Sequence, residues 1–109
     1  MNRSNRQIVT SNDRIELYSR EYYVTACGSA DLFLKSKGTQ MTFQQKKALK
    51  KSRLTPDMTV VDIGCGRGEL IYQLGLRCRR VFGLDYSPDG ASLSYETKSQ
   101  LPPEMKSRV

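Results

Sequence analysis

The sequence of this 109-residue chain predicts an α/β fold in which helices precede a single βαβ unit. Apolar residues in the first half recur at helical spacing, whereas residues 58–63 and 80–84 are short runs rich in β-branched and apolar residues. A glycine-rich stretch and a short amphipathic segment separate those two runs, which is the order of a strand–loop–helix–strand unit. The length fits one domain. We divide it into residues 1–53, a helical lead-in or cap, and residues 54–109, the α/β part.

The first predicted helix begins after a cluster of residues that favour helix N-caps, residues 11–13 (Ser-Asn-Asp). Residues 27–29 (Cys-Gly-Ser) then end it. Its apolar side has the spacing i, i+3, i+7 and i+11, which places four residues on one helical face. These residues are Ile15, Tyr18, Tyr22 and Ala26.

Two more helices are predicted before the βαβ unit. A short helix over residues 30–37 should end at Gly38, because glycine readily adopts the left-handed conformation that follows a helix. Thr42 and Gln45 have the spacing of a capping box, which predicts a further helix running to about Arg53. A Thr-Pro-Asp turn follows at residues 55–57.

The βαβ unit is predicted from residue 58 onward. Residues 58–63 are almost continuously apolar, which is typical of a parallel strand that is buried on both faces. A glycine-rich loop over residues 64–68 and a helix over residues 69–76 lead to the second strand, residues 80–84. Ser87 should cap the next helix, with proline at its first position, where a missing N–H costs nothing.

The positive charge is concentrated between Leu32 and Pro56, where seven bases and no acid occur. Such a stretch is compatible with a patch for RNA, DNA or an anionic substrate. It is also compatible with the solvated side of an amphipathic helix whose other side carries Met41, Gln45, Ala48, Leu49 and Ser52. We favour the solvated side, because charge runs usually serve solubility and only Phe43 is interleaved with the bases. The seven bases are Lys35, Lys37, Lys46, Lys47, Lys50, Lys51 and Arg53. Their number equals the formal net charge of +7.

The cysteines indicate a reducing, cytoplasmic location. Cys27, Cys65 and Cys78 are odd in number, lack CxxC spacing and occur with no histidine, so we expect neither a disulfide framework nor a metal site. No apolar run approaches the ~18–20 residues of a membrane-spanning helix, and the N-terminal residues show no apolar signal segment. We therefore expect no membrane partner.

The glycine-rich loop at residues 64–68 is the predicted functional site. Glycines after a buried strand allow close approach of the backbone to a ligand, and the following helix directs its unpaired N–H groups to the same point. Asp85 follows the second strand, 17 residues after Gly68, where its carboxylate can accept hydrogen bonds from a ribose diol. These features predict a cofactor that contains a nucleoside.

The charges around the loop favour a cationic cofactor over a pyrophosphate. A nicotinamide fingerprint is G-x-G-x-x-G, whereas residues 64–68 read G-x-G-x-G. Asp62 and Glu69 flank the loop, and two acids would repel a pyrophosphate and attract an ammonium group. S-adenosyl-L-methionine, with its ribose, α-amino group and sulfonium, fits this requirement. Cys65 has no histidine to act as a base, which argues against a nucleophile.

The two motifs resemble those of a known family. Residues 60–68 (Val-Val-Asp-Ile-Gly-Cys-Gly-Arg-Gly) resemble motif I of the class I S-adenosylmethionine-dependent methyltransferases, and residues 81–87 resemble the acidic end of that family's second strand. The resemblance covers about residues 54–109 and implies a Rossmann-like methyltransferase sheet with S-adenosyl-L-methionine as cofactor. It leaves the methyl acceptor and the catalytic residues unknown.

The resemblance also implies a role for each matching residue. Gly64, Cys65 and Gly66 would contact the methionine part of the cofactor, and Asp62 would lie near its amino group. The other implied cofactor-binding residues are Gly68, which would allow close packing of loop and helix, Asp85, which would hold the ribose hydroxyls, and Tyr86, which would lie against the adenine. Tyr18, Tyr22 and Tyr23 either cover the cofactor or pack in the core, and helical spacing favours the core.

Only the first two strands of such a sheet are visible in the sequence. Residues 101–109 read as the approach to a third strand that would begin at Val109, so the sheet is expected to be truncated there and completed by the rest of a longer chain or by a partner. We therefore expect a methyltransferase whose 109 residues are inactive by themselves. The alternatives are a nicotinamide-binding dehydrogenase fragment and a non-catalytic basic module that binds nucleic acid through residues 35–53.

Overall fold

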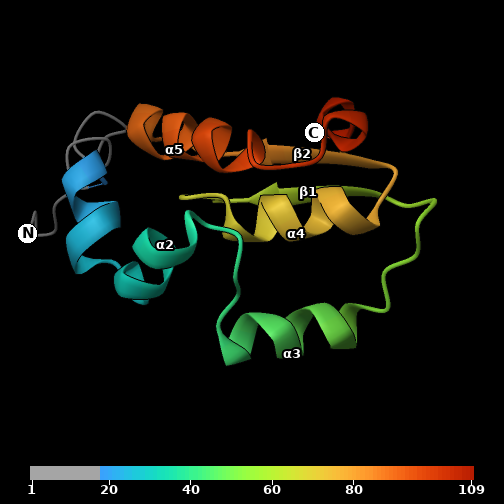
Figure 1. The fold of residues 1–109 in the computed structure, drawn as a ribbon, viewed down its shortest axis with the longest axis horizontal. Coiled ribbons are helices and arrows are strands. Elements are labelled where there is room, and N and C mark those ends of the chain that lie inside the picture. Colours follow the sequence, from blue (N-terminus) through green and yellow to red (C-terminus); the bar gives the residue numbers. More distant parts are fainter. Residues whose placement is uncertain (1–17) are drawn as a thin grey trace, which may run out of the picture.

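The computed structural model describes residues 18–109, and it confirms the predicted α/β fold (Figure 1). Three helical segments precede a parallel two-stranded sheet with one helix between its strands and two after them, consistent with a partial Rossmann-like unit. The elements are the π-helical turn η1 (Tyr22–Ala26), α2 (Ala30–Ser36), α3 (Phe43–Ser52), β1 (Thr59–Ile63), α4 (Glu69–Arg77), β2 (Arg80–Leu84), α5 (Pro88–Lys98) and the 3₁₀ helix η2 (Pro103–Arg108).

The buried side of the first helix differs from the predicted one. Ile15 and the predicted cap at residues 11–13 lie outside the described residues. In η1 the amide of Cys27 donates to the carbonyl of Tyr22, five residues back, and this wider turn rotates Tyr23 into the core and leaves Ala26 exposed. Tyr23, absent from the predicted stripe, is therefore the buried residue of this turn.

The predicted helix boundaries are confirmed to within a residue where a local cap determines them. The side chain of Thr42 accepts from the amide of Gln45, and the Gln45 side chain accepts from the amide of Thr42, which completes the capping box of α3. The hydroxyl of Ser87 accepts from the amide of Gly90 at the start of α5. These bonds join residues three apart, so the chain needs no distant partner to form them.

The predicted division of α3 into an apolar and a charged side is confirmed in part, because Gln45 and Leu49 are partly buried and the four lysines of the helix are exposed. No residue of α3 is buried; Leu49 is the partly buried residue that packs against the core, and Ala48 and Ser52 are exposed. Lys46 and Lys50 lie on the same side as Leu49, because i, i+3 and i+4 share one helical face, and Arg53 lines the same concavity from just after the helix. Figure 1 shows α3 standing apart from the layer formed by the sheet and α4.

The sheet is covered on one face within the described residues. Val60 pairs with Val81, and both pack under α4 with Ile71 and Leu74. On the other face Val61 is 51% exposed and Ile63 is 81% exposed, so the prediction of a strand buried on both faces is wrong for this chain. The alternating burial of β1 arises because side chains of successive residues point to opposite faces and only one face has a helix on it.

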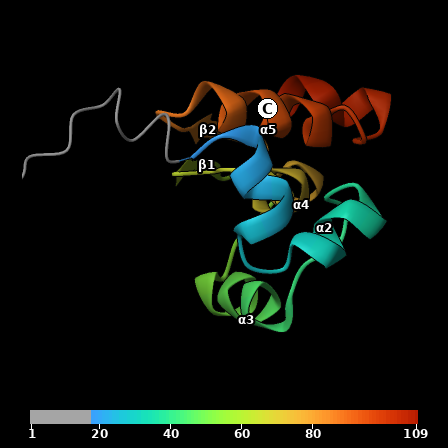
Figure 2. The ribbon, with the colours of Figure 1, turned by 90° about the vertical axis from the view of Figure 1, so that its left-hand side faces the viewer.

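A second cluster of buried side chains joins the N-terminal helices to α5. It contains Tyr23 from η1, Phe33 from α2 and Leu93 from α5. Figure 2, a view from the side of η1, shows that turn lying across the carboxyl ends of β1 and β2. The cluster thus places the N-terminal helices beside the glycine-rich loop.

The residues before Val109, where a third strand is expected to begin, adopt a 3₁₀ helix. Residues 103–108 form η2, and the amide of Met105 donates to the carbonyl of Pro102. Arg108 donates to the carbonyls of Gly75 and Leu76 at the end of α4, which anchors the segment. No helix among residues 18–109 is both long enough and apolar enough to span a bilayer.

Candidate functional site

A hollow of about 370 Å³ lies at the carboxyl ends of β1 and β2. This volume is within the ~300–1,000 Å³ range of small-molecule sites. The glycine-rich loop and the end of β2 form one wall, the tyrosines near η1 form another, and one residue of α3 contributes. Its lining residues are Tyr18, Tyr22, Tyr23, Cys27, Gln45, Gly64, Cys65, Gly66, Arg67, Glu69, Asp85 and Tyr86.

The loop owes its shape to three glycines in the left-handed region. Gly64, Gly66 and Gly68 have φ values of 74°, 52° and 91°. The amides of Gly64 and Cys65 both donate to the carbonyl of Leu84, at 2.7 and 3.1 Å, so the loop turns back over the end of β2. The loop and Asp85 are thereby held side by side.

Asp85 is oriented by two backbone amides. Its carboxylate accepts from the amide of Gly66 at 2.7 Å and from the amide of Ser87 at 2.9 Å, one bond to each oxygen. A carboxylate has about four lone-pair positions. Two therefore stay available for hydroxyl donors that enter the hollow.

Asp62 lies next to this site and is not among the residues that line the hollow. Burial, followed by the negative charges of Asp85 and Glu69, raises the pKa of the Asp62 carboxyl above its ordinary value of 3.8. The strand ends thus form a region of negative potential that a cation would relieve.

Hydroxyl groups on α5 hold the glycine-rich loop from behind. Ser94 donates to the carbonyl of Gly66 at 2.6 Å, and Thr97 donates to the carbonyl of Arg67 at 2.7 Å. A Cβ on Gly68 would lie 2.8 Å from the Cα of Ser94, so glycine is required there for close packing. The packing partner of Gly68 is α5, the second helix of the unit.

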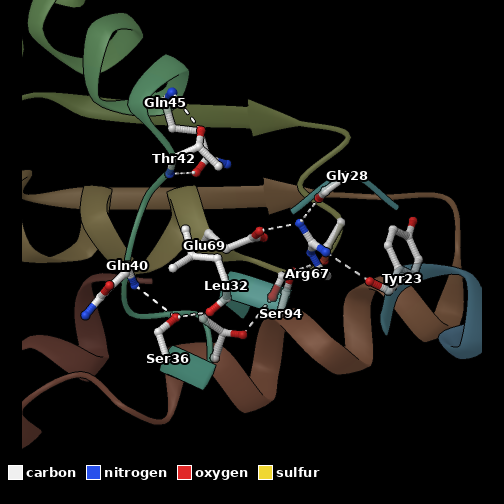
Figure 3. Close-up of polar contacts among 12 residues, drawn as sticks. Tyr23, Gly28, Leu32, Ser36, Gln40, Thr42, Gln45, Arg67, Glu69 and Ser94 are labelled. Carbon is white, nitrogen blue, oxygen red and sulfur yellow. Dashed lines mark hydrogen bonds and ion pairs between the residues drawn. The ribbon is translucent and has the colours of Figure 1, made fainter. Parts of the chain in front are cut away.

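Arg67 forms a buried clamp that sequence reasoning missed (Figure 3). Its guanidinium donates to the carbonyls of Tyr23 and Gly28, at 3.0 and 2.8 Å, and pairs with Glu69 at 2.7 Å. It also lies over the ring of Phe33, 5.1 Å from the ring centroid. No spacing rule in the sequence signals this role, because three of the four partners are 34 or more positions away in the chain.

The clamp changes the electrostatics expected from the sequence. Glu69 is one of the two acids expected to attract an ammonium group, but Arg67 neutralises it in a pair whose side chains are 6% and 9% exposed. The other acids at the strand ends are Asp62 and Asp85, and neither takes part in an ion pair within residues 18–109. The negative potential at the loop therefore comes from these two aspartates.

The tyrosines divide between core and rim. Tyr23 is buried, and this burial, together with the charge of Asp85, raises its pKa to about 12, so its hydroxyl is protonated at neutral pH. Tyr18 and Tyr22 are half-buried and line the hollow. Tyr86 is 48% exposed, and its ring meets that of Tyr18 edge-on at 5.7 Å. The interpretation as core is confirmed for Tyr23, and Tyr18 and Tyr22 pack against the same cluster, whereas their contact with a cofactor stays a prediction.

Cys65 has the environment of an inert thiol. Burial raises its pKa, and its Sγ lies 3.3 Å from the hydroxyl of Ser94. A raised pKa reduces the thiolate fraction on which nucleophilic attack depends. This environment supports the interpretation of Cys65 as a small loop residue.

Comparisons with curated proteins found methyltransferases. Over 61 residues the chain is 36% identical to the "Probable cobalt-precorrin-6B C(15)-methyltransferase (decarboxylating)" of Methanocaldococcus jannaschii, which covers 54% of this chain and 33% of that relative. Over 46 residues it is 39% identical to the protein of the same name from Methanobrevibacter smithii, covering 42% and 25%. The chain is a relative of methyltransferases.

A third methyltransferase relative comes from a eukaryote. The chain is 43% identical over 44 residues to an uncharacterized methyltransferase of Schizosaccharomyces pombe, covering 40% of this chain and 17% of that relative. The matched segments thus span a third or less of these relatives. No family model and no solved structure matches the chain. The resemblance inferred from the glycine-rich motif is confirmed at the level of methyltransferases.

Proposed function

We propose that this protein is an S-adenosyl-L-methionine-dependent methyltransferase and that residues 54–109 form the first part of its cofactor-binding domain. The observation that carries the proposal is the arrangement at the strand ends, where the left-handed glycine loop and the Asp85 carboxylate border one hollow. Methyltransferase relatives support the reaction class. S-adenosyl-L-methionine supplies an electrophilic methyl group on a sulfonium.

The residues present fit this cofactor. The two free lone-pair positions of Asp85 suit the two hydroxyls of a ribose. Asp62 and Asp85 together favour a positively charged amino-acid end, because their mutual repulsion falls when a cation lies nearby. Gly64 and Gly66 leave the wall of the hollow free of side chains, and Tyr86 offers a ring face for an adenine.

The chain's part in the reaction is to bind and orient the donor. Orientation of two reactants accounts for much of the rate of a bimolecular transfer, and it needs few acid–base groups. The hollow contains no histidine, because the chain has none. The three cysteines are free thiols, which supports the further proposal of a reducing, cytoplasmic location.

Ligand-induced stabilisation tests the proposal. S-adenosylhomocysteine at a hundred times its Kd should stabilise the folded protein by about 2.7 kcal/mol and raise Tm, whereas NADH should not. Asp85→Asn should abolish the shift, because it removes the charge and half of the acceptor capacity. Asp31→Asn, which removes the same charge from an exposed position on α2, is the matched control and should keep the shift.

A shift with NADH in place of S-adenosylhomocysteine would favour the dehydrogenase alternative. An equal S-adenosylhomocysteine shift in wild type and Asp85→Asn would show that the hollow is not the cofactor site. The expectation that these 109 residues turn over no acceptor by themselves stays a prediction. Methyl transfer with turnover by the purified chain would contradict it.

A further inference from the structure

A second concavity lies between α3 and the end of α4. It has a volume of about 480 Å³ and is lined by Lys46, Lys50, Arg53 and Arg77 together with three apolar residues, Met41, Leu49 and Leu54. No acid is among the lining residues. We call this concavity the cationic groove. It is separate from the hollow at the strand ends, although Gln45 of α3 lines that hollow and the adjacent Lys46 lines the groove.

The charges of the groove are uncompensated. Within residues 18–109 the ion pairs are Arg20–Glu96 and Arg67–Glu69, and α3 contributes to neither. Arg77 is held in place by Gln73, whose carbonyl and side-chain oxygen accept from it at 2.9 and 2.7 Å. Like charges that face each other across a groove repel, and an anion between them would convert that repulsion into attraction.

The cations at the groove are exposed, but they lie beside the one residue through which α3 packs against the core. In an ordinary surface helix, the side that faces the domain is apolar and the charges point to water. Lys46 and Lys50 of α3, with Arg53 just after its end, instead share a groove with Leu49, and no residue of the helix is buried. An isolated ten-residue helix is marginal in water, so α3 depends on its caps and on the packing of Leu49 against the core.

The spacing of the cations fits a repeating anion. Lys46 and Lys50 are about one helical turn apart, ~5.4 Å along the axis, and Arg53 follows at the C-cap of the helix. A single phosphate would engage one or two of them, whereas a phosphodiester chain presents a row of charges. The apolar side chains of Leu49 and Leu54 between the cations suit the sugars or bases of an unpaired strand.

We propose that the cationic groove binds the backbone of a single-stranded nucleic acid. Because Gln45 and Lys46 join the groove to the hollow, the bound strand passes beside the methyl-donor site. A nucleic acid is then the class of methyl acceptor, a step that rests on the function proposed above. An anionic membrane is the less suitable partner, since the cations line a concave groove and not a flat face.

Fluorescence anisotropy with a labelled 12-nucleotide RNA, and with DNA of the same sequence, tests the groove across a series of KCl concentrations. Binding to either strand should weaken with salt. Lys46→Gln/Lys50→Gln should reduce affinity about tenfold at low salt and should lower the slope of log K against log [KCl] by about 1.4, two contacts at ~0.7 each. Glutamine has nearly the helix propensity of lysine, so α3 should persist.

Lys47→Gln/Lys51→Gln is the matched control, because it removes two charges of the same type from the same helix outside the groove. It should change affinity and slope by less than half as much. Equal losses in the two double variants would overturn the proposal, as would the absence of salt-dependent binding to either strand. Binding to vesicles that contain phosphatidylserine, if reduced only by the groove variant while oligonucleotides fail to bind, would also overturn it.

The S-adenosylhomocysteine shift separates this proposal from the previous one. Both double variants should keep the wild-type shift, which also shows that they fold. Groove-dependent RNA binding without any S-adenosylhomocysteine shift would leave the groove standing and refute the methyltransferase proposal. An S-adenosylhomocysteine shift without groove-dependent nucleic-acid binding would support the methyltransferase proposal and overturn the groove proposal.

Discussion

Gly68 lies at the point of closest approach between the glycine-rich loop and α5. Its positive φ of 91° opposes any side chain, and so does the 2.8 Å separation between the position of an added Cβ and the Cα of Ser94. Gly64 shares only the first constraint, since its φ is 74° and nothing lies within 4 Å of the position of an added Cβ. Substitutions at the two glycines therefore distinguish the cost of backbone strain from the cost of a packing clash.

Gly68→Ala should destabilise the protein more than Gly64→Ala. Backbone strain costs about 1–2 kcal/mol at either position, and the clash with α5 adds about 1–3 kcal/mol at Gly68. Urea denaturation of the two variants measures the difference. Equal losses of unfolding free energy would mean that loop and helix are not in close contact.

Asp62 is a residue at which the proposed function and the stability of the fold oppose each other. Burial and the charges of Asp85 and Glu69 raise its pKa, so its ionised form costs the folded state free energy well above that pKa. The cost shrinks as pH falls through the raised pKa and disappears below the unfolded value of 3.8.

Asp62→Asn should therefore raise Tm at pH 7, and the gain should diminish as the pH is lowered toward 4. If Asp62 faces the amino group of the cofactor, the same variant should weaken the S-adenosylhomocysteine shift. Thermal melts across pH, with and without ligand, measure both effects. A lower Tm at neutral pH would show that the carboxylate stabilises the ligand-free fold.

Among the secondary-structure elements, α3 is held mainly by its own ends. The capping box closes its N-terminus, none of its residues is buried, and Leu49 is the residue through which it packs against the core. Such an element can open without unfolding the rest, because few buried contacts are lost.

Thr42→Ala removes the capping hydroxyl and should destabilise α3 by ~1 kcal/mol. Amide exchange in residues 46–52 should accelerate, while Tm falls by less than the ~4–8 °C expected if that energy belonged to the whole fold. Hydrogen exchange measured by mass spectrometry distinguishes local opening of α3 from unfolding of the whole fold. A full drop in Tm would show that α3 unfolds together with the sheet.

Across the whole molecule, Arg67 ties the N-terminal helices to the βαβ unit. Arg67 belongs to the glycine-rich loop, and its buried side chain donates to the carbonyls of Tyr23 and Gly28 and to the carboxylate of Glu69. Removing one partner of a buried pair leaves the other charge without compensation, which is more damaging than losing an exposed pair.

Arg67→Met should lower the unfolding free energy by about 3–5 kcal/mol, and Arg67→Met/Glu69→Gln should recover part of it. Arg20→Met breaks the exposed Arg20–Glu96 pair, whose side chains are 52% and 55% exposed, and serves as the control. It should cost at most about 1 kcal/mol. Urea denaturation gives all three values; no recovery in the double variant would mean that the carbonyl contacts of Arg67, and not its charge, hold the clamp.

The order of the elements and the loop of the candidate site could be predicted from the sequence. Thr42 with Gln45 and Ser87 with Gly90 form bonds over three residues, and the left-handed turns of the loop follow from glycine itself. Such features depend on neighbours in the chain, so local rules predict them.

What each side chain faces could be learned only from the folded chain. Arg67 meets carbonyls 39 and 44 positions away, and Ser94 meets the loop 28 positions away, pairings that no local spacing encodes. The lysines of α3 are exposed, as the sequence predicts, but the groove that Lys46 and Lys50 share with Arg77 of α4 exists only in the fold. The exposed side of β1 likewise depends on which helices cover the sheet, because burial is set by packing between distant segments.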